Sequence, residues 1–424
     1  MIRIIKVNNI DKFVLEIRPK RSQKDKLTVE SILNTVKKNG DDAIRKYEKK
    51  FSGANLKSLR VSDSEIKNAY SQVSKTEIKS LRMAKSRLEQ TEKTVHSLLK
   101  DRSVNISGVK VSKKFIPIDS VGCYVPGGLA KYPSSVIMSV VPAKVAGVKR
   151  IVVVSPPNSK GKIDPLTLVA SKICGAHEIY KTGGAQSIAA LAYGTKTIPR
   201  VNKIVGPGGA FVTAAKSMVS DHTGIDMLAG PTELAIIADN SADPRLIALD
   251  LFSQAEHSSD TFCYLITSSM KLAKSVEKSI SDLLSEIKRQ EFVKTSLNKN
   301  GFIAVCKTNS DIIQLANTLA PEHLQIMTKK PNLFSSKITN AGLILLGHQT
   351  PSSASDYILG SNHILPTNGF ATIRGSLSIL DFIKLTTYIT NTKSSLSKIS
   401  NYLKILTNAE GLPNHYEAVR GRLT

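Results

Sequence analysis

Residues 150–219 decide the fold, and they read RIVVVSPPNSKGKIDPLTLVASKICGAHEIYKTGGAQSIAALAYGTKTIPRVNKIVGPGGAFVTAAKSMV. Short apolar runs in this stretch, such as RIVVV, are typical of strands buried on both faces, and each is followed by a segment of helical character. Strands are predicted at 150–154, 178–181 and 203–205, and helices at 166–174, 185–191 and 210–219. This alternation predicts a parallel sheet of the doubly wound type.

A second alternating series occupies residues 234–346. It contains predicted strands at 234–238, 261–266, 302–305 and 343–346, and predicted helices at 247–256, 272–289 and 311–319. Helical periodicity also covers residues 26–100 and resumes at Leu377. We therefore expect an α/β protein with two parallel-sheet units, a helical N-terminal region and a helical C-terminal tail.

The composition of the 424 residues is that of a globular protein. Hydrophobic residues make up 41% and charged residues 22%, which excludes a largely disordered chain. No apolar run reaches the ~18 residues that cross a bilayer, and the opening MIRIIKVNNIDKF lacks the apolar block of a signal peptide. The four cysteines are scattered without CxxC spacing, so we expect them to be reduced and buried in a cytoplasmic protein.

The formal net charge of +25 raises the hypothesis of nucleic-acid binding. Residues 1–100 carry 24 Lys+Arg against 12 Asp+Glu, and the remaining excess is spread along the chain without a basic block. Aromatic residues are 5% of the chain and Trp is absent, which leaves few platforms for stacked bases. A lysine-rich solvated surface is therefore the preferred interpretation.

Two pairs of residues on or beside predicted helices could carry chemistry. Gln254 and His257 are three residues apart at a helix end, which places both on one face. Glu322 and His323 follow a predicted helix and offer two proton acceptors with different pKa values. Pattern alone favours ordinary surface hydrogen bonding for the first pair and an exposed loop for the second.

Two further pairs lie outside the predicted core. Asp356 and His363 fall in residues 347–375, a segment rich in Ser, Gly, Pro and Asn, and loops of this length usually carry function. Glu410 and His415 fall in the C-terminal tail. Carboxylates and imidazoles suit Zn²⁺, yet pattern alone favours solvated polar residues in both places.

Several glycine clusters follow predicted strands and precede helices, where helix N-termini accept phosphates. None of them fits GxGxxG, so the usual dinucleotide fingerprint is absent. The residues taken one by one thus indicate an α/β enzyme with a candidate metal site.

Eight segments taken together are far more specific. In order they are GCYVPGG, TGGAQSIAALAYGT, KIVGPGGAFVTAAK, DMLAGPTELAIIAD, LDLFSQAEH, LAPEHLQI, SDYILGSNHILPT and RGSLSILDFIK. In this order and spacing the chain closely resembles the histidinol dehydrogenase family over nearly its whole length.

The resemblance implies an NAD-dependent enzyme that oxidises L-histidinol to L-histidine through the aldehyde, the last two steps of histidine biosynthesis. It implies two incomplete Rossmann-like domains, one bound Zn²⁺ per subunit, and a homodimer whose C-terminal tail reaches the partner's site. The expected divisions are an N-terminal arm of 1–25, a first α/β domain of 26–123 with 232–377, a second α/β domain of 124–231, and a tail of 378–424.

By position, Gln254, His257, Asp356 and His415 match the family's zinc ligands, with His415 supplied by the other subunit. These four residues are also expected to surround the substrate, whose imidazole and amine would complete the metal's ligands. The metal would therefore orient the substrate.

Glu322 and His323 match the family's proton acceptors. Our hypothesis gives His323 the alcohol proton, with the substrate close by, and gives Glu322 the activation of water for attack on the aldehyde. Thr232, His363 and Glu410 match substrate-contacting positions, Thr232 standing where the family usually has Ser. Glu410, like His415, would come from the partner subunit.

Three positions match the family's NAD contacts. Tyr124 and Gln186 agree with the pattern, whereas Gly209 stands where the family usually has Asn. The glycine removes one side-chain amide and frees the backbone to approach a phosphate.

Two alternative functions remain at the level of sequence. One is a zinc-dependent hydrolase on the same scaffold, in which Glu322 activates water without a cofactor. The other is a basic nucleic-acid-binding protein, which retention of the presumed ligands and proton acceptors disfavours.

Overall fold

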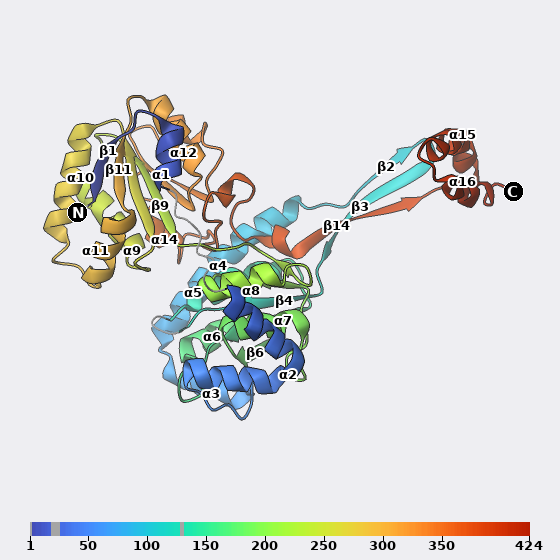
Figure 1. Cartoon of the computed structure of the whole chain (residues 1–424), viewed down its shortest axis with the longest axis horizontal. Coiled ribbons are helices and arrows are strands. Elements are labelled where there is room, and N and C mark those ends of the chain that lie inside the picture. Colours follow the sequence, from blue (N-terminus) through green and yellow to red (C-terminus); the bar gives the residue numbers. More distant parts are fainter. Residues whose placement is uncertain (1, 18–25, 128–130) are drawn as a thin grey trace.

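A computed structural model describes residues 2–17, 26–127 and 131–424. Figure 1 shows two α/β lobes and an arm that projects from them and carries the C-terminus at its tip. Each lobe is built on one parallel sheet, and the arm on a small antiparallel sheet. The predicted α/β class with two parallel-sheet units is confirmed.

The six-stranded sheet of the first lobe has the order β1-β11-β10-β9-β12-β13, and its neighbouring strands are all parallel. The strands are β1 (Arg3–Lys6), β9 (Glu233–Ala238), β10 (Phe262–Thr267), β11 (Phe302–Val305), β12 (His323–Met327) and β13 (Leu343–Leu346). Alternate residues face opposite sides. Leu234 and Ile236 pack with α9 (Pro244–Ala255), α10 (Met270–Leu283) and α11 (Gln290–Asn300). Ala235 and Ile237 pack with α1 (Ile10–Ile17) and α12 (Asn309–Leu319).

The five-stranded sheet of the second lobe has the order β6-β5-β4-β7-β8 and is also parallel. The strands are β4 (Ser120–Tyr124), β5 (Arg150–Ser155), β6 (Glu178–Lys181), β7 (Lys203–Val205) and β8 (Gly224–Ile225). One face packs on α3 (Asp63–Gln72), α4 (Lys75–Leu98), α5 (Pro133–Val145) and α6 (Pro165–Cys174). The other packs on α2 (Lys26–Ser52), α7 (Gly184–Tyr193) and α8 (Ala210–Met218).

The lobes divide the chain differently from the expected grouping of 26–123 with 232–377. Helices α2 to α4 and strand β4 belong to the lobe of the five-stranded sheet, whereas β1, expected in an arm of 1–25, pairs with β11. Residues 18–25 of that expected arm lie outside the described residues. β1 joins the six-stranded sheet by pairing with a strand about 300 residues later, which local periodicity does not reveal.

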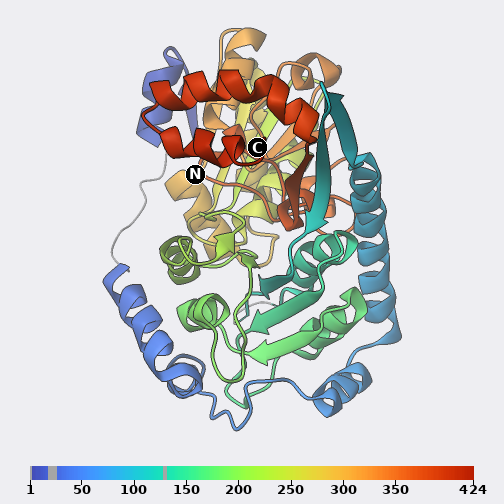
Figure 2. The same cartoon turned by 90° about the vertical axis from the view of Figure 1, so that its right-hand side faces the viewer.

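The expectation of a wholly helical tail is wrong at its start. Residues 379–382 form a short 3-10 helix, and β14 (Ile383–Thr390) is a strand. It pairs antiparallel with β3 (Val109–Pro117), which also pairs with β2 (Arg102–Ile106). The β-branched and aromatic residues of β14 favour a strand once a partner is present. The α-helices of residues 378–424 are α15 (Lys393–Ala409) and α16 (Pro413–Arg420), seen from the tip of the arm in Figure 2.

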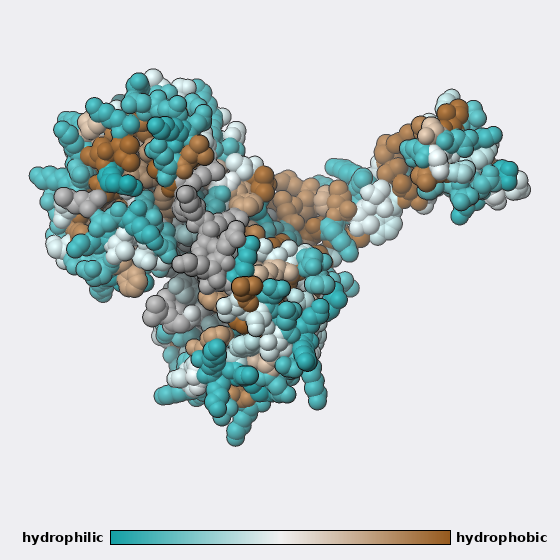
Figure 3. Space-filling model, viewed as in Figure 1, coloured by the Kyte–Doolittle hydropathy of each residue, from teal (hydrophilic) through white to brown (hydrophobic). Residues whose placement is uncertain are grey.

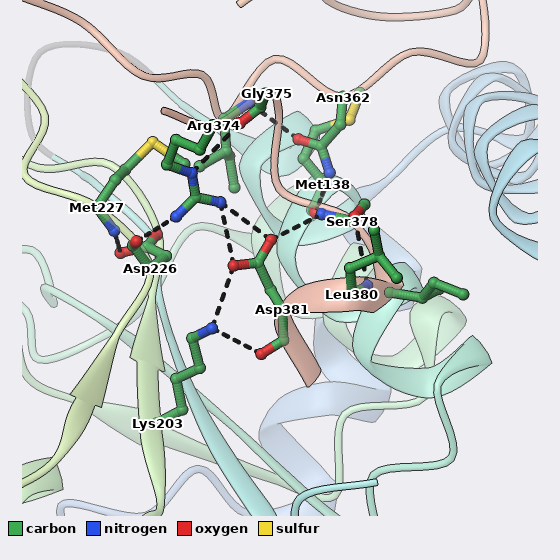
Figure 4. Close-up of polar contacts among 12 residues, drawn as sticks. Met138, Lys203, Asp226, Met227, Asn362, Arg374, Gly375, Ser378, Leu380 and Asp381 are labelled. Carbon is green, nitrogen blue, oxygen red and sulfur yellow. Dashed lines mark hydrogen bonds and ion pairs between the residues drawn. The ribbon is translucent and has the colours of Figure 1, made fainter. Parts of the chain in front are cut away.

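A partly buried polar cluster anchors the base of the arm to the second lobe (Figure 4). Asp381, just before β14, accepts hydrogen bonds from Lys203 of β7 at 3.1 Å and from Arg374 at 3.0 Å on each carboxylate oxygen. Arg374 also donates to the backbone carbonyl of Asp226, beyond β8. On the other side, Glu92 of α4 accepts the backbone N–H of Ile379 at 2.8 Å. These hydrogen bonds therefore hold the base of the arm to the second lobe.

Two smaller expectations can be compared with the structure. The four cysteines are free and buried, as predicted. In the described part of the chain, no helix combines the length and apolarity that crossing a membrane requires.

Glu92 should make the stability of the protein depend on pH. Burial, with a contribution from the nearby charge of Asp381, raises its pKa to about 7, above the value of 4.5 in an unfolded chain. Its stabilising contribution is therefore complete below pH 4.5 and is lost as pH rises through 7. Glu92→Gln keeps an acceptor for Ile379 but cannot ionise. The unfolding free energy of the variant minus that of the native protein should therefore be about 1–3 kcal/mol larger at pH 8 than at pH 5.

Urea unfolding at the two pH values measures this difference. Glu89→Gln is the matched control on the same helix, because salt bridges to Lys85 and Lys93 hold the pKa of Glu89 below its usual range. The difference in unfolding free energy between Glu89→Gln and the native protein should be the same at pH 5 and at pH 8. Parallel pH curves for Glu92→Gln and the native protein would contradict the prediction.

Candidate active site

Glu322 and His323 lie at the start of β12, inside the six-stranded sheet. β12 has β9 on one side and β13 on the other, and His323 is aligned with Leu234 and Leu343. Both residues are buried, with 4% and 2% of their surface exposed. The pattern-based expectation of an exposed loop is therefore wrong, because β12 was not recognised as a strand.

Two carboxylates hold the starts of β9 and β12 together. Glu322 accepts the backbone N–H of Glu233 at 2.7 Å, and Glu233 accepts the backbone N–H of Glu322 at 3.2 Å. Glu233 also accepts the backbone N–H of Asn368 at 2.8 Å, which ties in the long irregular segment. Burial raises the pKa of Glu322 to about 8, so its protonation changes near neutral pH, as a general base requires.

His323 is held at both ring nitrogens. Nδ1 lies 3.2 Å from the backbone oxygen of Glu233, and Nε2 lies 3.1 Å from Oδ1 of Asp356. Each of these oxygens accepts, so the arrangement favours a ring that carries both protons. Burial lowers the pKa of His323, but the hydrogen bond to Asp356 and the charges of Glu322 and Asp356 outweigh it and raise the pKa to about 9.

Asp356 gathers other predicted site residues around it. It follows α14 (Ser352–Ser355), and its backbone oxygen accepts Nδ1–H of His363 at 2.7 Å. Burial raises the pKa of its carboxyl, but the hydrogen bond from His323 and the charges of His323, His363 and His257 together lower it below the ordinary value. Asp356 and these three imidazoles therefore lie within electrostatic reach of one another.

Gln254 and His257 come from the C-terminal end of α9. The backbone N–H of His257 donates to the carbonyl of Gln254 at 3.2 Å, which keeps the two residues one turn apart. Gln254 is buried and His257 is exposed. Thr232, directly before β9, places Oγ1 3.3 Å from Oγ1 of Thr261.

Glu410 and His415 are not brought to this site within one chain. They lie at the tip of the arm, at the end of α15 and in α16, and both are exposed (Figure 1). Among the described residues, no three His, Cys, Asp or Glu side chains are grouped to hold a metal ion. Of the four predicted zinc ligands, only His257 and Asp356 are residues of these types that lie in the body of the chain. Gln254 carries an amide, and His415 lies on the arm.

The predicted cofactor residues lie at the carboxyl ends of strands in the other sheet. Tyr124 ends β4 and accepts the backbone N–H of Gly184 at 3.3 Å. Burial raises the pKa of its hydroxyl to about 12, so the group keeps its own proton. Gln186 is in the first turn of α7, and Gly209 is the exposed N-cap of α8.

Sequence reasoning missed two buried carboxylates, Glu233 and Glu48. Glu48, in α2, accepts hydrogen bonds from the turn that precedes α7. Glu233 could have been noticed as a charge at the start of an apolar run, and Glu48 as an acidic residue four positions after the core residue Ile44. Neither signal distinguishes a buried carboxylate from an exposed one.

The turn before α8 offers a matched pair of glycines. Gly206 has φ +114°, and a Cβ there would overlap the backbone oxygen of Tyr124, whereas a Cβ at Gly209 meets nothing within 4 Å. We expect Gly206→Ala to destabilise the protein by about 3 kcal/mol or more, and Gly209→Ala by less than about 1 kcal/mol. Urea unfolding of both variants measures the difference. Equal losses would contradict the predicted geometry of this turn.

Comparisons with known proteins give similar sequences over nearly the whole chain. The histidinol dehydrogenase family model matches residues 16–423. The histidinol dehydrogenase of Methanocaldococcus jannaschii is 42% identical over 396 residues, 93% of this chain and 92% of the relative. That of Oceanobacillus iheyensis is 41% identical over 407 residues, 96% and 94% of the two chains.

A solved structure has the same architecture over the full chain. The crystal structure of histidinol dehydrogenase from Elizabethkingia anophelis matches with a TM-score of 0.94 and 34% identity, covering 100% of this chain and 98% of that one. The family match and the relatives both span more than nine-tenths of the sequence. The chain therefore belongs to the histidinol dehydrogenase family and is an oxidoreductase.

Proposed function

We propose that this oxidoreductase uses NAD⁺ to convert L-histidinol to L-histidine through L-histidinaldehyde, in two successive hydride transfers. The observation that carries the proposal is the buried Glu322–His323 pair joined to Asp356. The two groups have different surroundings, and their pKa values are both raised, to about 8 for Glu322 and about 9 for His323, which gives two distinct proton acceptors for a reaction that must remove protons at two stages.

In the first stage the alcohol loses a hydride to NAD⁺ and a proton to His323, which gives the aldehyde. In the second, Glu322 would take a proton from water as it adds to the aldehyde, and the resulting ionised gem-diol would lose the second hydride to another NAD⁺ to give the acid, whose proton passes to solvent. His323 can accept a proton only when Nε2 is released from Asp356. If Asp356 bound a metal ion, its carboxylate would no longer accept a hydrogen bond from Nε2–H of His323, and Nε2 would be free to take the substrate's proton.

The residues present fit a zinc site shared by two chains. Gln254, His257 and Asp356 of one subunit, with His415 of the other, offer one amide oxygen, one carboxylate and two imidazoles, a mixture that suits Zn²⁺. When bound, the ion would fix the substrate's imidazole and amine. His363 of the body and Glu410 of the arm would contact the same substrate, next to Thr232.

The arm supports a homodimer in which each subunit completes the other's site. It exposes large apolar side chains that a solvated surface does not favour, visible as brown atoms in Figure 3. They include Val104, Ile106, Leu385, Ile389, Tyr402, Ile405 and Leu406. Packing against a second copy would bury them and would carry His415 and Glu410 away from their own body.

The cofactor residues also fit their proposed role. The hydroxyl of Tyr124 and the side chain of Gln186 flank Gly184, and Gly209 opens onto free space at the start of α8. These three residues end or follow β4, β6 and β7 at the carboxyl edge of one parallel sheet, where α/β sheets bind nucleotides.

The proposal is tested by following NADH absorbance with L-histidinol as substrate. We expect two NADH per histidine formed, and loss of turnover when a chelator removes the metal. Zn²⁺ should restore the activity. Histidinol consumption without NADH would favour a hydrolase instead, and no reaction with zinc-loaded dimer would refute the proposal.

Glu322→Gln should separate the two stages. It keeps the size of the side chain but removes the base that activates water. Oxidation of histidinaldehyde should therefore fall at least about 100-fold, and oxidation of histidinol to the aldehyde much less. Single-turnover measurements on each substrate give the two rates. Equal loss of both would remove the proposed division of labour.

Mixed dimers test the shared site. His257→Ala and His415→Ala homodimers should each be nearly inactive. A heterodimer with one variant chain of each kind contains one site with both histidines, so it should recover about half of the native activity. Co-expression with two affinity tags isolates it. An inactive heterodimer would show that His257 and His415 of the same chain act together.

A further inference from the structure

Glu48 is a buried carboxylate that collects hydrogen bonds from the turn between β6 and α7. It has none of its surface exposed. Its Oε1 accepts three donors, each at 2.9 Å: Thr182 Oγ1, the backbone N–H of Gly183, and Nε2 of Gln186. Its Oε2 accepts Oγ of Ser52 at 2.8 Å. Four donors on one carboxylate satisfy a group that would otherwise be costly to bury.

This arrangement fixes which end of the Gln186 amide faces away from Glu48. A carboxylate only accepts, so the amide nitrogen must point to Glu48, and the amide oxygen Oε1 turns towards Gly184. Within the described part of the chain, Oε1 of Gln186 receives no hydrogen bond. Gly184 in turn donates its N–H to the hydroxyl of Tyr124, so one turn holds both residues.

The same carboxylate occupies the start of α7. Gly183 is the N-cap of this helix and has no side chain to cap it, so Glu48 accepts the N–H that the turn exposes. A negative charge at a helix N-terminus is favoured, and it also repels a second anion at the same place. The N–H of Gly183 is therefore not available to a phosphate, and the charge of Glu48 disfavours one beside it.

We propose that Glu48 is a positioning residue for cofactor recognition. It orients Gln186 so that the amide presents its oxygen to a hydrogen-bond donor of NAD⁺, a neutral part of the molecule and not its pyrophosphate. This role rests on the proposed function of Tyr124 and Gln186. Glu48 itself need not touch the cofactor.

The test is the dissociation constant of NAD⁺ measured by isothermal titration calorimetry on the native dimer and on Glu48→Gln. An amide at position 48 allows Gln186 to turn over, so we expect NAD⁺ to bind about tenfold more weakly or worse, while the dissociation constant of histidinol changes less than twofold. Equal weakening of both ligands, or unchanged NAD⁺ binding, would overturn the proposal.

Glu65→Gln is the matched control. Glu65 is a carboxylate of α3 that pairs with Lys181, directly before Thr182, at 3.1 Å and has no hydrogen bond to Gln186. NAD⁺ should bind this variant within twofold of the native protein. A loss as large as that of Glu48→Gln would mean that any carboxylate near this turn has the same effect, which overturns the proposal.

Exchanging the carboxylate of position 48 with the amide of position 186 keeps the test valid if Glu48→Gln folds poorly. Gln186→Glu alone sets two carboxylates against each other and should abolish NAD⁺ binding. Adding Glu48→Gln restores a donor opposite an acceptor and should recover at least about tenfold in affinity. No recovery would overturn the proposal. Failure of the native dimer to bind NAD⁺ would instead refute the cofactor assignment itself.

Discussion

The parallel pairing of β9 with β12, with Glu233 and Glu322 each accepting the other's backbone N–H, is the constraint on which the site depends. It places the side chain of Glu322 among buried groups and sets His323 against the carbonyl of Glu233. Burying two carboxylates so close together is unfavourable, and the backbone donors of Glu233, Glu322 and Asn368 offset part of that cost. The raised pKa of Glu322 follows from the same burial.

The remaining parts of the proposed site come from three places that the sheet does not control. Gln254 and His257 depend on where α9 ends, and Asp356 on the irregular segment that Asn368 ties to Glu233. His415 and Glu410 depend on the arm, whose base is fixed by Asp381, Arg374, Lys203 and Glu92. One body thus carries Glu322 and His323, and in the proposed site the arm would supply His415 and Glu410 to the body of another subunit.

Much of the fold could be predicted from the sequence because strands buried on both faces give continuous apolar runs, as at 150–154 and 262–267. β14 and β12 could not be predicted from the sequence, for two different reasons. The leucines and isoleucines around β14 also fit a helical period, and its strand conformation depends on β3, which lies more than 250 residues earlier. β12 begins at His323, directly after Glu322, and this pair of titratable residues resembles a loop until its neighbours bury it.

The site residues were predicted through the resemblance and not through their individual patterns. Spacing placed Gln254 and His257 on one helix end, and the structure agrees, but no local signal joins Asp356 to His323 across 33 residues. Glu48 and Glu233 were missed because a buried carboxylate looks like any other acidic residue until its hydrogen-bond partners are known. Gly209 was predicted as a cofactor contact from its position in the family pattern. In the structure its surroundings are open, which shows only that a side chain would fit there.

The most direct test of a site shared between subunits is anomalous diffraction at the zinc edge from crystals of the zinc-loaded protein with histidinol. We expect one zinc peak per subunit, within ligand distance of Gln254, His257 and Asp356 of one chain and of His415 from the other. A zinc ion held entirely by residues of one chain, or one with His415 far from it, would contradict the shared site.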